Sequence, residues 1–216
     1  MYRQRILFAL LLGLSLVLTG CSGGKELTAG QIEAVNAAFE PVVPAEEGDI
    51  AAGQGPEGAF TVNPITHFFT SCYETPEELD LGKFVAYIPS DSPLSPGDED
   101  ELDALRAAGF PVSFDRVEDA PVVIKRVPFS TVDAYLQRYA GVSLSAMENP
   151  GDAWYLEDYG CFYSLASDFN PGSFACTRGV QRGDSLVLYS ADAVLTLARS
   201  GDTWQIISHL PAEDPE

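Results

Sequence analysis

Apolar residues between positions 28 and 140 recur every three or four residues, which is the spacing of amphipathic helices. The first run follows Thr28 and Gln31, which have the spacing of a capping box, and it stops at Pro41. We therefore expect a helix over 29–39. Later helix starts are Asn63-Pro64, Thr75-Pro76 and Asp98–Glu101. The buried stripes expected behind them are Ile65, Phe68, Phe69 and Cys72; Leu81, Phe84, Val85 and Ile88; and Leu102, Leu105 and Ala108.

A last helix is expected after an extended stretch at Val122–Val127, with Ser130 or Thr131 as its cap and Gly141 at its end. Its inward residues would be Val132, Tyr135, Leu136 and Tyr139. The segment 41–59 is different, because it is rich in Pro, Gly, Ala and Glu and has no apolar period. This composition predicts a mobile surface loop.

From Trp154 onward the apolar period changes from 3.6 to 2, and β-branched and aromatic residues dominate. The strands expected there are 155–167, 173–180, 185–190, 193–199 and 203–209. Short links rich in Gly, Asn and Asp join them, which indicates an antiparallel meander. The predicted fold class is therefore α+β, with N-terminal helices packed on a C-terminal antiparallel meander of four to five strands.

In topology this order resembles the cystatin-like and NTF2-like cone folds, in which helices pack into the concave face of a curved sheet. The likeness covers residues 63–209 and no sequence motif carries it. The expected organisation is an N-terminal helix and loop over 28–62, a single α+β domain over 63–210 and an acidic tail over 211–216.

The chain opens with a short basic stretch, Met1–Arg5, followed by 13 almost wholly apolar residues, Ile6–Leu18. This run is shorter than the roughly 20 residues that span a bilayer. The sequence Leu18-Thr19-Gly20-Cys21 resembles the lipobox of bacterial lipoproteins. The resemblance implies a signal peptide over 1–20, lipid on Cys21, a tether over 21–27 and a location on the extracytoplasmic face of the cell membrane.

The charge of the chain is strongly negative, at −20, and removal of the leader would make it −22, because that segment holds Arg3 and Arg5 and no acid. Nucleic acid is an improbable partner for such a chain, since phosphate binding is driven by basic residues. The acidic excess also argues against a second, electrostatic attachment to anionic lipid. It is typical of a solvated, self-repelling surface.

Three cysteines remain beside Cys21. Cys72 is expected to be a buried thiol on its helix. A hairpin between 155–167 and 173–180 would place Cys161 and Cys176 about 13 Å apart along the strands, too far for a disulfide. No close grouping of Cys and His indicates a zinc site, and we expect neither a metal nor a cofactor.

Catalytic motifs are also missing from the sequence. His67 lies off the apolar stripe of its helix and about 140° from Cys72, so it is expected at the surface, while His209 is expected as a satisfied edge residue. The serines have no nucleophile-elbow context and no Gly-rich phosphate loop is present. Glu157 and Asp158 would point to opposite faces of a strand, so they would not form a glycosidase pair.

The densest unusual feature is the aromatic run from Trp154 to Tyr163. On one continuous strand, Tyr155, Tyr159 and Tyr163 would share a face. Tyrosine is less suited to a dry core than phenylalanine, because its hydroxyl needs a partner. We therefore expect at least two of these rings to be solvent-accessible and to line a concavity with polar neighbours. We take Trp154, Tyr155, Tyr159 and Tyr163 as candidate ligand-binding residues. Ordinary core packing is the alternative.

Two phrases, Asn63-Pro64-Ile65 with Phe68-Phe69-Thr70-Ser71 and Ser167-Asp168-Phe169 with Pro171-Gly172-Ser173-Phe174, resemble those of a group of uncharacterised lipoproteins of Gram-positive bacteria. That group implies the location but no activity. The sequence thus favours a membrane-anchored, non-catalytic module that binds a protein, peptide or small ligand. A secreted hydrolase with a site gathered from distant segments, and a purely structural role, remain as alternatives.

Overall fold

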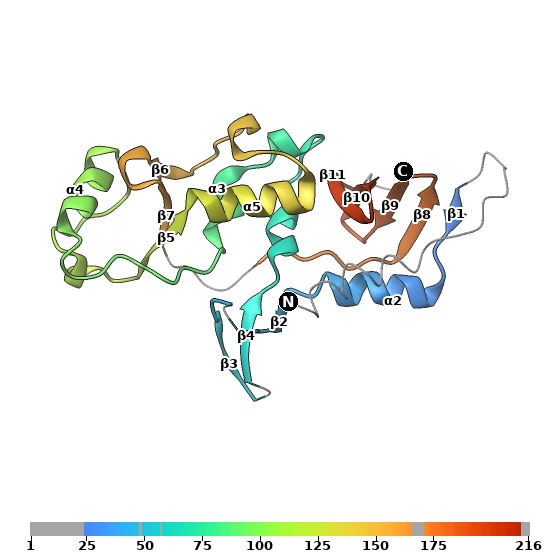
Figure 1. Cartoon of the computed structure of the whole chain (residues 1–216), viewed down its shortest axis with the longest axis horizontal. Coiled ribbons are helices and arrows are strands. Elements are labelled where there is room, and N and C mark those ends of the chain that lie inside the picture. Colours follow the sequence, from blue (N-terminus) through green and yellow to red (C-terminus); the bar gives the residue numbers. More distant parts are fainter. Residues whose placement is uncertain (1–23, 48, 57, 166–170, 213–216) are drawn as a thin grey trace.

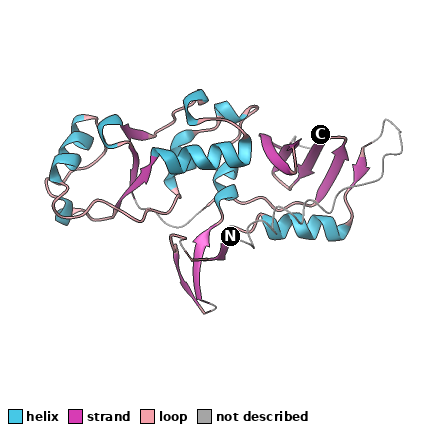
Figure 2. Cartoon of the chain, viewed as in Figure 1, coloured by secondary structure: helices cyan, strands magenta, loops and turns pink. Residues whose placement is uncertain are grey.

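A computed structural model describes residues 24–47, 49–56, 58–165 and 171–212. The predicted signal peptide, Cys21 and most of the acidic tail lie outside this range. The described chain forms a mixed α+β structure that is elongated along one axis (Figure 1). Figure 2 shows the helices and strands of the described chain. Most of the helices precede the C-terminal strands in sequence, so the predicted fold class is confirmed.

The longer helices begin close to where the sequence places them. Helix α2 (Ala29–Ala38) starts at a complete capping box, in which the Gln31 amide donates to Thr28 Oγ1 at 3.3 Å and the Thr28 amide donates to Gln31 Oε1 at 2.8 Å. Helices α3 (Leu81–Ala86) and α4 (Glu99–Ala107) bury the predicted leucines and phenylalanine. Helix α5 (Phe129–Ala140) starts directly after Pro128, earlier than expected, and ends at Gly141 with φ 73°.

The segment after Asn63 is a 3-10 helix, η2 (Pro64–Phe69), and this overturns two predictions. Every residue from Ile65 to Phe69 is buried, because this tight turn is enclosed by neighbouring elements on all sides. His67 is therefore in the interior and not at the surface. The helix ends before Cys72, whose side chain is exposed and not buried.

The largest sheet is antiparallel and has the strand order β1-β8-β9-β10-β11. Its strands are β1 (Lys25–Glu26), β8 (Arg178–Arg182), β9 (Ser185–Tyr189), β10 (Ala193–Ser200) and β11 (Thr203–Pro211). The last four form the predicted meander. The first was expected to be part of a tether, but Lys25 and Glu26 pair with β8 and Glu26 accepts from Arg178 at 2.7 Å.

The predicted strand 155–167 does not join that meander. It is broken into β6 (Trp154–Leu156), a 3-10 turn η6 (Glu157–Tyr159) and β7 (Cys161–Leu165), because Gly160 takes a left-handed conformation with φ 60°. The two strands fold back on each other and pair with β5 (Ile124–Pro128) in the order β5-β7-β6. The period of 2 and the short links had placed this segment in the C-terminal meander.

The segment 41–59 was expected to be a loop, yet it contributes to a small antiparallel sheet. Its strands are β2 (Val42–Pro44), β3 (Gly53–Gly55) and β4 (Gly58–Val62), in the order β2-β4-β3. The segment has no apolar period that could indicate these strands, and they are defined by backbone pairing with one another.

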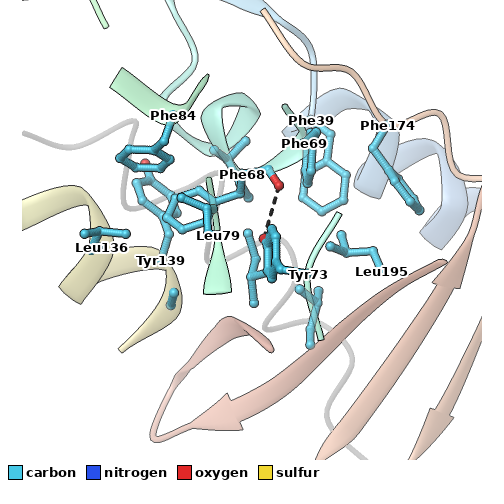
Figure 3. Close-up of a cluster of buried hydrophobic side chains, with 14 of the residues drawn as sticks. Phe39, Phe68, Phe69, Tyr73, Leu79, Phe84, Leu136, Tyr139, Phe174 and Leu195 are labelled. Atoms are coloured by element: carbon cyan, nitrogen blue, oxygen red, sulfur yellow. Dashed lines mark hydrogen bonds between the residues drawn. The ribbon is translucent and has the colours of Figure 1, made fainter. Parts of the chain in front are cut away.

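Two clusters of buried side chains hold these parts together. The larger cluster is rich in aromatic residues and joins α2, η2, α3 and α5 to one face of the five-stranded sheet (Figure 3). Within it the Tyr73 hydroxyl donates to the Phe68 carbonyl at 3.1 Å. The smaller cluster packs α4 and its flanking loops onto the β5-β7-β6 sheet, which we call the three-stranded sheet from here on. Its members include Leu102, Leu105 and Tyr163. Helix α2 and its C-cap contribute Val35 and Phe39 to the larger cluster, and β1 pairs with β8, so the chain before position 63 is in contact with the C-terminal sheet.

Candidate functional site

Three aromatic side chains at one end of the three-stranded sheet are exposed to solvent over part of their area. They are Phe129, Tyr155 and Tyr159, with 39%, 40% and 40% of their area exposed, and we call them the aromatic surface. They come from the start of α5, from β6 and from η6. Tyr155 and Tyr159 are thus the two exposed rings of the three tyrosines, while the expected concavity stays a prediction.

The backbone fixes the positions of these rings. The Phe129 amide donates to the Gly160 carbonyl at 2.9 Å, so the turn that carries Tyr159 lies beside the first residue of α5. Tyr155 is opposite the buried Phe162 in the β6–β7 ladder, and their ring centroids are 4.8 Å apart. Tyr155 also lies 6.0 Å from the Phe129 ring, at an interplanar angle of 54°. The rings therefore stand on ordered backbone, and part of each ring is exposed to solvent.

Carboxylates accompany the rings. Glu157 and Asp158, which form η6 together with Tyr159, are both exposed. Among the described residues neither carboxylate has an ion-pair or hydrogen-bond partner. Because no described residue holds these two carboxylates, both can contact a ligand.

Tyr163 lies on the opposite face of the same sheet and is 1% exposed, so the predicted three-tyrosine face is wrong. Its hydroxyl donates to the buried carboxylate of Glu101, which also accepts from Arg126 Nη1 at 2.8 Å. Burial, and then the bond to Glu101, raise the pKa of Tyr163 well above its usual value. The Tyr163 side chain is therefore held in the interior, where its hydroxyl is a hydrogen-bond donor to Glu101.

Trp154 shares that inner face. It is half-buried, and its ring meets Phe110 edge-on at 5.7 Å between centroids. Of the four residues selected from the sequence, the structure brings Tyr155 and Tyr159 to the aromatic surface and assigns Trp154 and Tyr163 to packing. Phe129 was missed, because the expected helix began after it, with Ser130 or Thr131 as its cap.

A second group of functional side chains lies inside the molecule. His67 has no exposed area, and its ring stacks on Tyr135 with 6.1 Å between centroids and meets Phe84 at 5.7 Å. Neither ring nitrogen has a hydrogen-bond partner in the part of the chain that the structure describes. Burial, with a smaller contribution from the positive charge of Lys125, lowers the pKa of His67 to about 3.

Lys125 is near enough to His67 for its charge to act on the imidazole, and Ser164 lies opposite Lys125. They are direct partners in the β5–β7 ladder, so their side chains leave the same face of the sheet. The Lys125 amine donates to the Ala86 carbonyl at the end of α3, and burial lowers the pKa of Lys125 to about 8. Ser164 Oγ is buried and has no hydrogen-bond partner among the described residues. The Ser164 hydroxyl and the His67 imidazole nitrogens are closed to solvent, and no hydrogen bond joins them in the described structure.

The three described cysteines are free thiols, so the prediction that Cys161 and Cys176 are not bonded to each other is confirmed. Cys176 is the buried one, and burial raises its pKa. His209, expected as a satisfied edge residue, is buried; its Nδ1 lies 2.7 Å from the Ser71 carbonyl oxygen, while its Nε2 has no partner. Across the described part of the chain, no group of His, Cys, Asp and Glu could hold a metal ion.

No helix in the described residues is long and apolar enough to cross a membrane. Comparison with known proteins adds no relative: no family model, no curated protein and no solved structure matches this chain. The aromatic surface and the leader therefore carry the functional argument.

Proposed function

We propose that this protein is a bacterial lipoprotein, held on the extracytoplasmic face of the cell membrane by lipid on Cys21, whose domain binds a partner through the aromatic surface without catalysing a reaction. The observation that carries the binding role is the exposure of Phe129, Tyr155 and Tyr159 on an ordered backbone. Aromatic residues supply much of the binding energy at protein interfaces, because each ring buries a large apolar area.

The placement of this surface supports the proposal. Lys25 of β1 follows Cys21 by four positions, and this stretch of chain reaches at most roughly 14 Å. Strand β1 and the lobe that carries β6 lie toward opposite ends of the long axis (Figure 1). A lipid on Cys21 would therefore hold one end of the molecule near the membrane and leave the aromatic surface toward the far end.

A hydrolase is the alternative that the interior group of His67, Lys125 and Ser164 raises. We favour binding over hydrolysis because the reactive atoms of His67 and Ser164 are buried. A substrate would have to reach them through packed side chains, whereas a ligand meets the aromatic surface directly.

The anchor is tested by replacing Cys21 with Ala in the native cell. Without the thiol no thioether to lipid forms, so the protein should appear in the medium or remain as an uncleaved precursor. Membrane fractionation and intact-mass measurement would show either outcome. A Cys21→Ala protein that is still cleaved and still held in the membrane fraction would refute the lipid anchor.

The binding role is tested by photo-crosslinking in living cells. A photoreactive phenylalanine at position 159 should give a discrete crosslinked product, because Tyr159 faces the partner. The matched control is the same reagent at Val42, an exposed apolar residue of another sheet. No product at position 159, or the same products at both positions, would refute the proposed surface.

A further inference from the structure

The molecule covers several aromatic rings with its own cations. Arg138 lies over Tyr139 at 5.2 Å, Arg178 over Tyr189 at 5.0 Å and Arg199 over Trp204 at 5.6 Å from the ring centroids. In the described structure no such cation lies over Phe129, Tyr155 or Tyr159, although these are the more exposed rings. The aromatic surface therefore offers ring faces that the chain itself leaves without a positive charge.

The charge around these rings is negative. Glu157 and Asp158 lie between Tyr155 and Tyr159 in sequence, and neither has a cationic partner among the described residues. The whole segment 139–177 holds five acidic residues and no Lys, Arg or His. From this segment of the chain, a ligand therefore meets carboxylates and no cation.

Ring faces and carboxylates attract the same kind of group. The face of an aromatic ring carries negative electrostatic potential and binds an ammonium or guanidinium ion within about 6 Å of its centroid. A carboxylate beside the ring adds a charge-assisted hydrogen bond. We infer that the aromatic surface binds the lysine or arginine side chains of a basic polypeptide. The inference rests on the proposed binding role and adds the chemistry of the partner.

A polypeptide fits better than a single small cation. One exposed cation–ring contact is weak, so useful affinity needs several contacts at once. The three rings and two carboxylates are spread over α5, β6 and η6 and can meet successive side chains. The charge of −20 would also draw a basic chain toward the protein over distances comparable to the Debye length.

The test uses the full-length lipidated protein in non-ionic detergent micelles and a fluorescent hexa-arginine peptide. Hexa-citrulline, which has nearly the same shape but no charge, is the matched probe. Fluorescence anisotropy should show hexa-arginine binding roughly tenfold more tightly, with affinity that falls as salt rises. Equal binding of both peptides would overturn the inference.

Variants separate this surface from the general negative charge. The pair Tyr155→Leu and Tyr159→Leu should weaken hexa-arginine binding about fivefold, whereas Tyr159→Phe should not. Glu157→Gln with Asp158→Asn should weaken it more than Glu33→Gln with Glu40→Gln, two exposed acids at α2. Equal losses from both acidic pairs would mean that net charge alone is sensed, which overturns the inference. Failure of these tests with a positive crosslink at position 159 would remove the basic partner and leave the proposed function standing.

Discussion

Tyr155 and Tyr163 belong to the same β-hairpin, yet their side chains lie on opposite faces of the three-stranded sheet. Tyr163 is 1% exposed and gives its hydroxyl to Glu101, while Tyr155 is 40% exposed and rests on Phe162. The inner face, which carries Tyr163, is completed by a carboxylate and a guanidinium. The outer face, which carries Tyr155, packs Val127 and Phe162 on the larger cluster and ends in the exposed ring of Tyr155. The comparison shows that a tyrosine is buried here only where the chain supplies a partner for its hydroxyl.

The largest effect is expected when the buried network of the inner face is cut. Replacing Glu101 with Ala leaves Arg126 and the Tyr163 hydroxyl without their acceptor, and should lower the free energy of unfolding by about 3 kcal/mol. Asp103→Ala is the control, because Asp103 is an exposed acid on the same helix that also pairs with an arginine. It should cost less than about 1 kcal/mol. Equal losses in urea unfolding would contradict the contrast between the faces.

A second effect concerns pH and the buried His67. Its folded-state pKa is about 3 and its ordinary value is 6.5, so the unfolded chain binds the extra proton as the pH falls below 6.5. The stability is complete above pH 6.5 and should fall by about 2 kcal/mol by pH 5. In His67→Phe this part of the loss should vanish, with Lys125 and Tyr135 still facing the site. The same pH dependence in both proteins would show that other groups cause it.

The two tyrosines themselves give a smaller contrast. Tyr163→Phe removes a hydrogen bond to a charged group and should cost about 1.5 kcal/mol. Tyr155→Phe removes a hydroxyl from an exposed ring and should change the stability by less than about 0.5 kcal/mol. Thermal melts of both variants provide the measurement, and a larger loss for Tyr155→Phe would reverse the assignment of the two faces.

The smallest effect is expected at Tyr159, which makes no ring contact within the described structure. Tyr159→Ala should leave the free energy of unfolding within about 0.5 kcal/mol of the original value. A loss above about 2 kcal/mol in urea unfolding would mean that this side chain supports the fold and is not kept for a partner.

Local signals in the sequence predicted most of the helices and the C-terminal meander. The Thr28 capping box and the leucine pairs of α4 needed only neighbouring residues, and each appears in the structure. The break of the aromatic strand could not be predicted in this way, because Gly160 permits a left-handed turn without requiring one. The burial of Tyr163 depends on Glu101, and the burial of His67 depends on α5. Both partners are distant in sequence, so the local period of apolar residues could not show whether these two side chains lie in the core or at the surface.

The central claim is that the aromatic surface exists for binding and not for stability. The direct test places the photoreactive phenylalanine at position 129 and combines it with Tyr155→Ala and Tyr159→Ala in living cells. We predict that the crosslinked product disappears while the purified variant keeps at least half of its unfolding free energy, since only Tyr155 loses a packing contact. A crosslink that persists at full yield in the folded double variant would contradict the account.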